Sequence, residues 1–158
     1  MDSRRRNLLQ TGGGMTLLTM LAAAGWLRPQ PALAADAWNA AAFETKSMDA
    51  TMKALGGGTP AQSIGITFLQ TPDIAENGAV VPIGVASSIP KTESIAILVE
   101  KNPNMLTAVF DIPPGTEPSI STRVKMGQSS NVYALVKADG KYYVASKEIK
   151  VTLGGCGG

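Results

Sequence analysis

The chain has 158 residues, one cysteine and no histidine. This composition excludes an internal disulfide, every histidine-based catalytic triad and the common zinc, haem and copper ligand sets. The formal net charge is +2 and the sequence pI is about 8.8, but much of the positive charge lies near the N-terminus.

The first residues have the pattern of an export signal. Arg5 and Arg6 precede Asn-Leu-Leu in a twin-arginine pattern, and a short apolar stretch occupies residues 15–27. Ala32 and Ala34 fit the small-x-small rule for signal cleavage. We therefore expect residues 1–34 to be a twin-arginine signal peptide, cleaved after Ala34, and the mature protein to reside in the periplasm. Because this route carries folded proteins and no cofactor site is visible, we expect a partner chain and no cofactor.

An N-terminal membrane anchor is the alternative interpretation of the same region. It is disfavoured because Pro29 and Pro31 interrupt the apolar stretch and no second apolar run follows. Cleavage would remove four arginines and one aspartate, so the formal charge of residues 35–158 becomes −1. The mature chain is thus expected neither to bind nucleic acid nor to span a membrane.

Residues 35–58 are predicted to form a short helical segment. Met48, Met52 and Leu55 recur at helical spacing, Ser47 can cap a turn that starts at Met48, and three glycines and a proline follow. Packing on the domain is the expected role of these apolar residues. The sequence does not decide whether two aromatic residues, Trp38 and Phe43, belong to an earlier helical turn.

The pattern changes from helical to alternating at about residue 62, and residues 59–153 are predicted to form one strand-rich domain. Turn residues separate seven candidate strands: 62–69, 79–86, 94–101, 105–112, 118–126, 131–138 and 141–153. Their number and even spacing favour an all-β fold, an immunoglobulin-like antiparallel β-sandwich of about seven strands. The last strand is expected to stay paired until about Thr152.

Two Gly-containing turns and one proline add detail to this fold. Asp139-Gly140 is the strongest hairpin signal, because a type I′ turn requires positive φ at both positions. Asn77-Gly78 is interpreted as a simple hairpin turn, and Pro82 is expected at a sheet edge or bulge because it lacks an N–H. For the apolar residues beside it, a buried strand is the default and a partner interface the alternative: Val80, Val81, Ile83 and Val85.

The single cysteine lies between two pairs of glycines, in Gly154-Gly155-Cys156-Gly157-Gly158. A fold has no packing need for a cysteine there, because glycine has no side chain and loses much entropy on ordering. Residues 154–158 are therefore predicted to be a flexible, swinging arm. With an ordinary pKa near 8.5 the thiol is mostly protonated, and the nearest positive charge in sequence is Lys150. These features favour a carrier whose cargo is bound to Cys156, rather than an enzyme.

The chain resembles the SoxY family, the sulfur-carrier subunits of the bacterial thiosulfate-oxidising Sox system. The most specific resemblance is the Gly-Gly-Cys-Gly-Gly motif at residues 154–158, supported by the twin-arginine leader. Further similar stretches are residues 76–83, 124–127 and 130–134.

The resemblance implies a non-catalytic carrier in periplasmic thiosulfate oxidation. Cys156 would hold sulfur first as a cysteine S-thiosulfonate and then as a persulfide. The implied partners are a SoxZ-like subunit in a heterodimer and three transient enzymes: a SoxAX-type cytochrome that attaches thiosulfate, a SoxB-type hydrolase that releases sulfate and, where present, a sulfane dehydrogenase. No metal site and no catalytic residue are expected in this chain.

Other functions of Cys156 remain open at this point. The main alternative is an exported structural or adhesive β-sandwich whose cysteine forms an intermolecular disulfide. A lipid or coupling handle and a cloning scar are further options. A carrier that holds sulfur as a C-terminal thiocarboxylate is disfavoured, because the ATP needed to activate the carboxylate is absent outside the cytoplasm.

Overall fold

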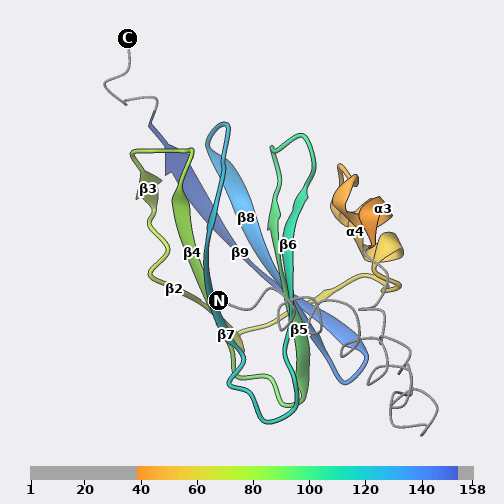
Figure 1. Ribbon diagram of the computed structural model, residues 1–158. Coiled ribbons are helices and arrows are strands. Elements are labelled where there is room, and N and C mark those ends of the chain that lie inside the picture. The colour runs from red at the N-terminus through yellow and green to blue at the C-terminus, as the bar shows by residue number, and fades with distance from the viewer. Residues whose placement is uncertain (1–38, 153–158) are drawn as a thin grey trace, which may run out of the picture. The chain divides into compact units, whose positions relative to one another are not determined.

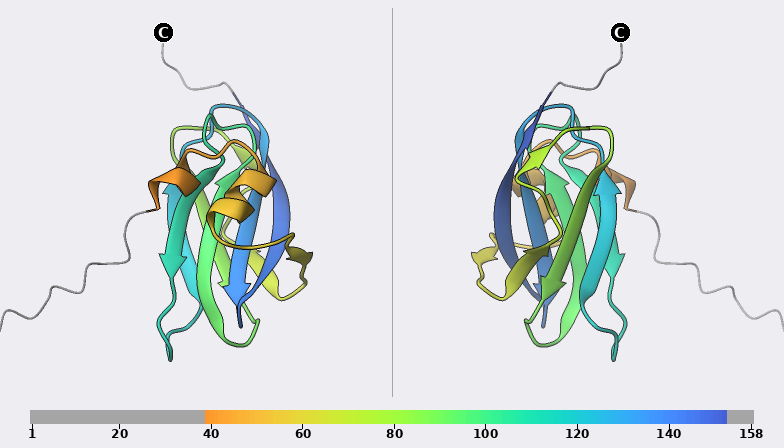
Figure 2. Two further views of the ribbon diagram at one scale, coloured as in Figure 1. Left: turned by 90° about the vertical axis from the view of Figure 1, so that its right-hand side faces the viewer. Right: turned by 90° about the vertical axis from the view of Figure 1, so that its left-hand side faces the viewer.

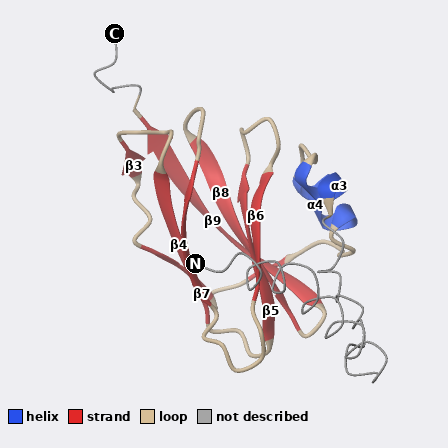
Figure 3. Cartoon of the chain, viewed as in Figure 1, coloured by secondary structure: helices blue, strands red, loops and turns tan. Residues whose placement is uncertain are grey.

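The computed structural model describes residues 39–152, in which helices are few and strands dominate (Figure 3). The helices are α3 (Ala40–Phe43) and α4 (Met48–Ala54). The strands are β1 (Ala61–Gln62), β2 (Ile66–Leu69), β3 (Ile74–Ala75), β4 (Val81–Ser87), β5 (Thr92–Val99), β6 (Leu106–Asp111), β7 (Ser119–Val124), β8 (Ser130–Ala138) and β9 (Lys141–Val151). The predicted signal peptide, Trp38 and the Gly-Gly-Cys-Gly-Gly motif lie outside the described residues.

Two sheets pack face to face in an immunoglobulin-like β-sandwich, as predicted (Figure 1). The larger sheet has the order β1-β9-β8-β5-β6, with β3 also paired to β9, and the smaller sheet has the order β2-β4-β7. Each of the seven predicted strands has a counterpart. The two-residue strands β1 and β3 were not predicted and pair with β9 in parallel. They are too short to produce an alternating pattern, so the sequence carried no signal for them.

The space between the sheets is filled by the inward-facing residues of the long strands. Ile95, Ile97 and Val99 alternate along β5 and are fully buried, and β4 and β8 contribute in the same way. This period of two is the pattern that predicted the strands. The core therefore follows directly from the sequence.

A second core lies on the outer face of the larger sheet, which α3 and α4 cover (Figure 2, left). Met52 of α4 packs in one cluster with Leu98, Leu135 and Val144. The predicted cap is confirmed, because the Ser47 hydroxyl accepts a hydrogen bond of 3.2 Å from the backbone N–H of Ala50. In residues 39–152 no helix is long and apolar enough to cross a membrane.

The helical segment is divided into two short helices instead of continuing as one. Thr45 lies between them, and its backbone carbonyl accepts a hydrogen bond of 2.8 Å from the N–H of Met105, the residue just before β6. Its hydroxyl is 2.6 Å from that of Thr51 in α4. The chain therefore leaves the helical path at Thr45 to bond to the sheet. Phe43, which the sequence left open, is the last residue of α3.

The structure confirms one predicted hairpin and corrects the other. Asp139 and Gly140 have φ of 48° and 72°, as a type I′ turn between β8 and β9 requires. Asn77-Gly78 does form a turn, with a hydrogen bond of 3.3 Å from Val80 N–H to the Asn77 carbonyl. However, it joins β3 in one sheet to β4 in the other and is not a hairpin. A hairpin turn and a turn between two sheets differ in which strands are paired, and the local sequence of the turn does not show that pairing.

Pro82 lies in β4, the central strand of the smaller sheet, yet its position is a local edge. β2 pairs with β4 only from Gly84 to Ser87, so Pro82 is paired with β7 alone, opposite Arg123. Gly84, two residues along, points its N–H toward the β2 side. By the alternation of the strand, the missing N–H of Pro82 faces the side that β2 leaves open. The expectation for Pro82 is confirmed in this local sense.

Candidate functional site at the end of β9

The structure describes the point from which the Gly-Gly-Cys-Gly-Gly motif continues. Cys156, Gly154, Gly155, Gly157 and Gly158 themselves lie outside the described residues. β9 ends at Val151, and the described chain ends one residue later at Thr152. Three connecting loops lie at this end of the sandwich, between β3 and β4, β5 and β6, and β7 and β8 (Figure 1).

The backbone N–H groups at the end of β9 donate hydrogen bonds on both sides of the strand. On one side, the N–H groups of Lys150 and Thr152 donate to the carbonyls of Asp73 and Ala75, at 2.9 and 3.0 Å. On the other side, the N–H of Val151 donates to the Ser129 hydroxyl at 2.9 Å. The strand therefore stays bonded until Thr152, as predicted, and the following residues start from a fixed position.

Gly78 lets the β3–β4 turn pack against this end of β9. A Cβ atom at Gly78 would lie 2.4 Å from the carbonyl oxygen of Met126 and 2.8 Å from Val151 Cγ1. The Gly78 carbonyl accepts a hydrogen bond of 2.7 Å from Met126 N–H. Asn77 orders the turn, because its side-chain oxygen accepts from Ala79 N–H at 2.9 Å. The glycine is thus required here for close packing, since its φ is not in the left-handed region.

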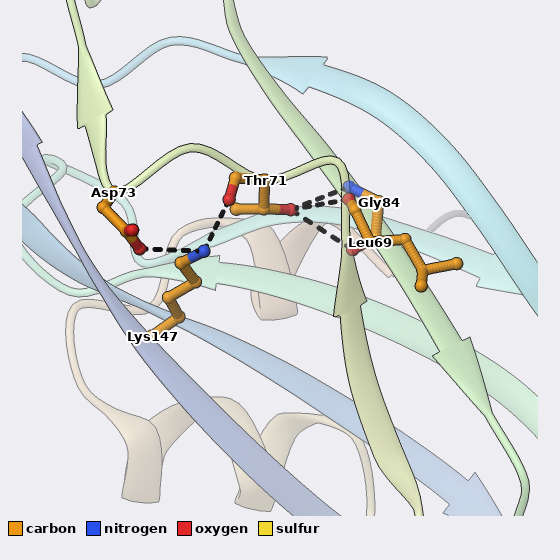
Figure 4. Close-up of polar contacts among 5 residues, drawn as sticks. All are labelled: Leu69, Thr71, Asp73, Gly84 and Lys147. Atoms are coloured by element: carbon orange, nitrogen blue, oxygen red, sulfur yellow. Dashed lines mark hydrogen bonds and ion pairs between the residues drawn. The ribbon is translucent and has the colours of Figure 1, made fainter.

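A crossing segment joins the smaller sheet to the larger one and supplies β3. Leu69 ends β2, and Thr71 and Asp73 lead to β3 (Figure 4). The buried Thr71 hydroxyl accepts from Gly84 N–H at 3.1 Å and donates to the Leu69 carbonyl at 3.0 Å. Lys147 of β9 donates to the Thr71 carbonyl and forms an ion pair of 3.0 Å with Asp73. These contacts link both sheets beside the end of β9.

Sequence reasoning missed this crossing segment. Lys147 has the parity of Ile149 and Val151, which pack in the core between the sheets, and an inward-facing lysine in a strand indicates a polar partner inside the fold. That signal was available. The identity of the partners was not, because Thr71 and Asp73 are more than seventy residues away in the sequence and their pairing depends on the tertiary fold.

A group of charged residues lies at the opposite end of the sandwich, around the β8–β9 hairpin. Lys137 and the Gly140 N–H bond to Glu93 and hold the pKa of its carboxyl below the usual value. Lys91, 2.9 Å from Asp139, lowers the pKa of that carboxyl in the same way. These contacts support the hairpin, and they are remote from the end of β9. In the described part of the chain no cluster of acidic residues is placed to hold a metal ion.

Comparison with known proteins identifies the family. The family described as "Sulfur oxidation protein SoxY" matches residues 51–156, which include the whole sandwich and Cys156. The chain belongs to the SoxY family. The sulfur carrier protein SoxY from Chlorobium limicola f thiosulfatophilum has a similar structure, with a TM-score of 0.60 and 40% sequence identity over 66% of this chain and 96% of that one.

More distant solved structures are similar as well. A superoxide reductase (neelaredoxin) from Ignicoccus hospitalis matches with a TM-score of 0.48 and 20% identity, over 55% of this chain and 79% of that one. No curated protein matches the chain. The assignment to the SoxY family thus rests on the family's match to residues 51–156 and on the similarity to the Chlorobium SoxY structure.

Proposed function

We propose that this SoxY-family chain is a non-catalytic sulfur carrier in periplasmic thiosulfate oxidation and that Cys156 is the site of covalent attachment. The family match, which extends to residue 156, carries the proposal. The related Chlorobium SoxY is described as a sulfur carrier protein. In this division of the chain, residues 1–34 direct twin-arginine export, residues 35–58 and 59–153 form the body, and residues 154–158 are the swinging arm.

The structure supports this role through the position of Thr152. Thr152 directly follows a strand that is hydrogen-bonded on both sides, and Cys156 is the fourth residue after it. At roughly 3.3–3.6 Å per extended residue, the thiol reaches about 13 Å beyond the sandwich. Gly154, Gly155, Gly157 and Gly158 leave the backbone bare, so that it fits a narrow enzyme channel. The arm thus presents the sulfur while the body stays outside the channel.

The chemistry at Cys156 proceeds in two balanced steps, both catalysed by visiting enzymes. First, the thiol and thiosulfate form an S–S bond and lose one proton and two electrons, which a SoxAX-type cytochrome accepts. Second, a SoxB-type hydrolase adds water to the resulting S-thiosulfonate, releasing sulfate and leaving a persulfide on Cys156. A sulfane dehydrogenase, where present, oxidises the remaining sulfur. The carrier supplies the sulfur atom of attachment and no catalytic group.

A SoxZ-like subunit completes the carrier as a heterodimer. A partner acquired before export agrees with the twin-arginine pattern at Arg5 and Arg6. Copurification of the mature chain with a small strand-rich protein tests this part. A stable monomer in gel filtration of the periplasmic fraction would contradict it.

Intact-protein mass spectrometry tests the attachment site. The mature chain with its partner subunit is incubated with thiosulfate and the cytochrome, and a mass increase corresponding to one S-thiosulfonate is expected. The adduct should disappear on reduction. A Cys156→Ala variant that gains the same mass would refute the proposal, whereas an obligatory disulfide dimer without any sulfur adduct would favour a crosslinking role.

A further inference from the structure

The outer face of the smaller sheet differs from an ordinary solvated face. In a sheet with one face toward water, polar residues are expected at the outward positions. The outward positions of β4 are instead Pro82, Gly84 and Ala86, preceded by Val80, which is 49% exposed. The inward positions of β4 are fully buried valines and isoleucine. The strand therefore has the sequence of one that is covered on both sides.

No described helix lies over this face, whereas α3 and α4 cover the outer face of the larger sheet (Figure 2, right). Val80 is thus exposed while Val81, Ile83 and Val85 are buried. The sequence left two interpretations open for these residues, a buried strand and a partner interface. Val81, Ile83 and Val85 fit the buried strand, and only Val80 is exposed enough to contact a partner. We name the outward face of β2, β4 and β7 the β4 face.

The β4 face contains a hollow of about 280 Å³. It is lined by Gln70, Pro82, Gly84, Ser121, Thr122 and Arg123. A side chain at Gly84 is not accommodated, because its Cβ would lie 2.4 Å from the carbonyl oxygen of Leu69. The side chain of Leu69 itself is 40% exposed beside the hollow. Four of the six lining residues are polar, so the hollow offers hydrogen-bonding groups, and the apolar contact on this face comes from Val80 and Leu69, which are exposed.

Arg123 places a positive charge on this face, to which an acidic group of a partner protein can bind. It lies directly opposite Pro82 in the β4–β7 pairing and is exposed. The described residues contain three ion pairs, and Arg123 takes part in none of them. The remaining outward positions of β2 and β7 are uncharged: Thr67, Leu69, Ser119 and Ser121. A carboxylate on the partner would complete the contact with Arg123.

The size of the β4 face favours a transient partner. The strands β2, β4 and β7 have four, seven and six residues, and at about 3.3 Å per residue and about 4.8 Å between strands they cover roughly 270 Å². Stable subunit interfaces bury about 800 Å² on each side. The face is thus too small to hold a permanent subunit by itself, and it fits a protein that binds and leaves.

The β4 face is also structurally continuous with the end of β9. Thr71 is bonded to Gly84 on this face, and the crossing segment continues from Thr71 to β3. The segment from Asp73 to Ala75 in turn accepts hydrogen bonds from Lys150 and Thr152. A protein seated on Gly84 and Leu69 therefore lies on the segment that holds the start of the arm.

We propose that the β4 face is the transient docking surface for the enzymes that react with the sulfur on Cys156. The occupant is a folded protein that places an apolar side chain against Val80 and Leu69 and a carboxylate on Arg123. This inference rests on the proposed carrier function and adds the surface of the body that the enzymes recognise. Docking there raises the local concentration of the thiol at the enzyme's channel.

Two variants of the mature heterodimer test the proposal, Val80→Glu and Arg123→Glu. Val109→Glu is the matched control, because Val109 is an exposed valine on β6 of the other sheet, 36% exposed. The measured quantity is the KM for the carrier when the cytochrome attaches thiosulfate. We expect a rise of about tenfold or more in both test variants and no change in the control. Alkylation of Cys156 by iodoacetamide should proceed at the wild-type rate in all three, and circular dichroism should show the native fold.

Each other outcome contradicts the proposal. A wild-type KM in Val80→Glu and Arg123→Glu would overturn the docking surface and leave the carrier function intact. Loss of the partner subunit on copurification would show that the face binds that subunit, which also overturns transient docking. If either substitution unfolds the chain, Arg123→Gln replaces it, with a smaller rise in KM expected. Failure of the wild-type chain to gain an adduct on Cys156 would instead refute the carrier function itself.

Discussion

The backbone N–H of Thr152 donates a hydrogen bond of 3.0 Å to the carbonyl oxygen of Ala75, which lies 77 residues earlier in the chain. Ala75 belongs to a strand of only two residues, and this strand fixes the last part of β9. In the proposed carrier, the arm with Cys156 would therefore begin at a point held by a distant segment. A carrier gains from this arrangement, because a fixed origin limits the volume that the thiol searches.

Gly78→Ala should loosen the end of β9. The added Cβ would meet the Met126 carbonyl oxygen at 2.4 Å, so the turn must move away from Val151. We expect a loss of about 1–3 kcal/mol in the free energy of unfolding, measured by urea denaturation. Gly127→Ala is the control, because nothing lies within 4 Å of a Cβ there. Equal stability of the two variants would show that the contact at Gly78 is not tight.

Thr71→Val should destabilise the crossing segment. The substitution removes the hydroxyl that accepts from the buried Gly84 N–H and leaves this donor without a partner. An unsatisfied buried donor costs about 1–3 kcal/mol, to be measured as a change in the free energy of unfolding. Thr67→Val, at an exposed position of β2, should change stability little. A neutral Thr71→Val would mean that water replaces the hydroxyl.

Ser47→Ala should weaken α4 and the second core. The Ser47 side chain accepts from the Ala50 N–H, and loss of such an N-cap costs about 1 kcal/mol. Thermal unfolding should show a lower Tm, and Ser47→Asp should restore it because aspartate caps equally well. No recovery with aspartate would indicate that the serine acts through another contact.

Acidic pH should destabilise the end of the sandwich that contains the β8–β9 hairpin. The pKa values of Glu93 and Asp139 are lowered in the folded state, mainly by hydrogen bonds from Lys137 and Lys91 respectively. A lowered folded pKa gives stability that is present above the unfolded value, near 4, and lost as the pH falls through the folded value. The Tm of the wild type should therefore fall between about pH 5 and pH 2.

A double variant isolates this contribution. Glu93→Gln with Asp139→Asn should show a smaller fall of Tm over the same pH range, since neither amide titrates. The difference is expected to be small, because both carboxylates are exposed to solvent. Glu117→Gln, an exposed loop position, serves as the control. A pH profile of the double variant parallel to that of the wild type would contradict the assignment.

The seven long strands, the Ser47 cap and the Asp139-Gly140 turn could be predicted because their causes are local. Alternation along a strand, a capping hydroxyl and positive φ depend on a few neighbouring residues. The β-sandwich followed from the number of such strands. Cys156 was also visible at once, because a cysteine between glycines has no packing role in a fold.

What the sequence determined by itself is the set of strands, the sandwich and the candidate sulfur site, since each is written in a short stretch of chain. Only the tertiary structure decided that β3 holds the end of β9, that Asn77-Gly78 joins two sheets and that Lys147 bonds to the Thr71 carbonyl. It also decided that Val80 and Pro82 are exposed while Val81, Ile83 and Val85 are buried. These features depend on which distant segments meet. Hydrophobic periodicity predicts that a residue is buried, but it does not predict which segment buries it.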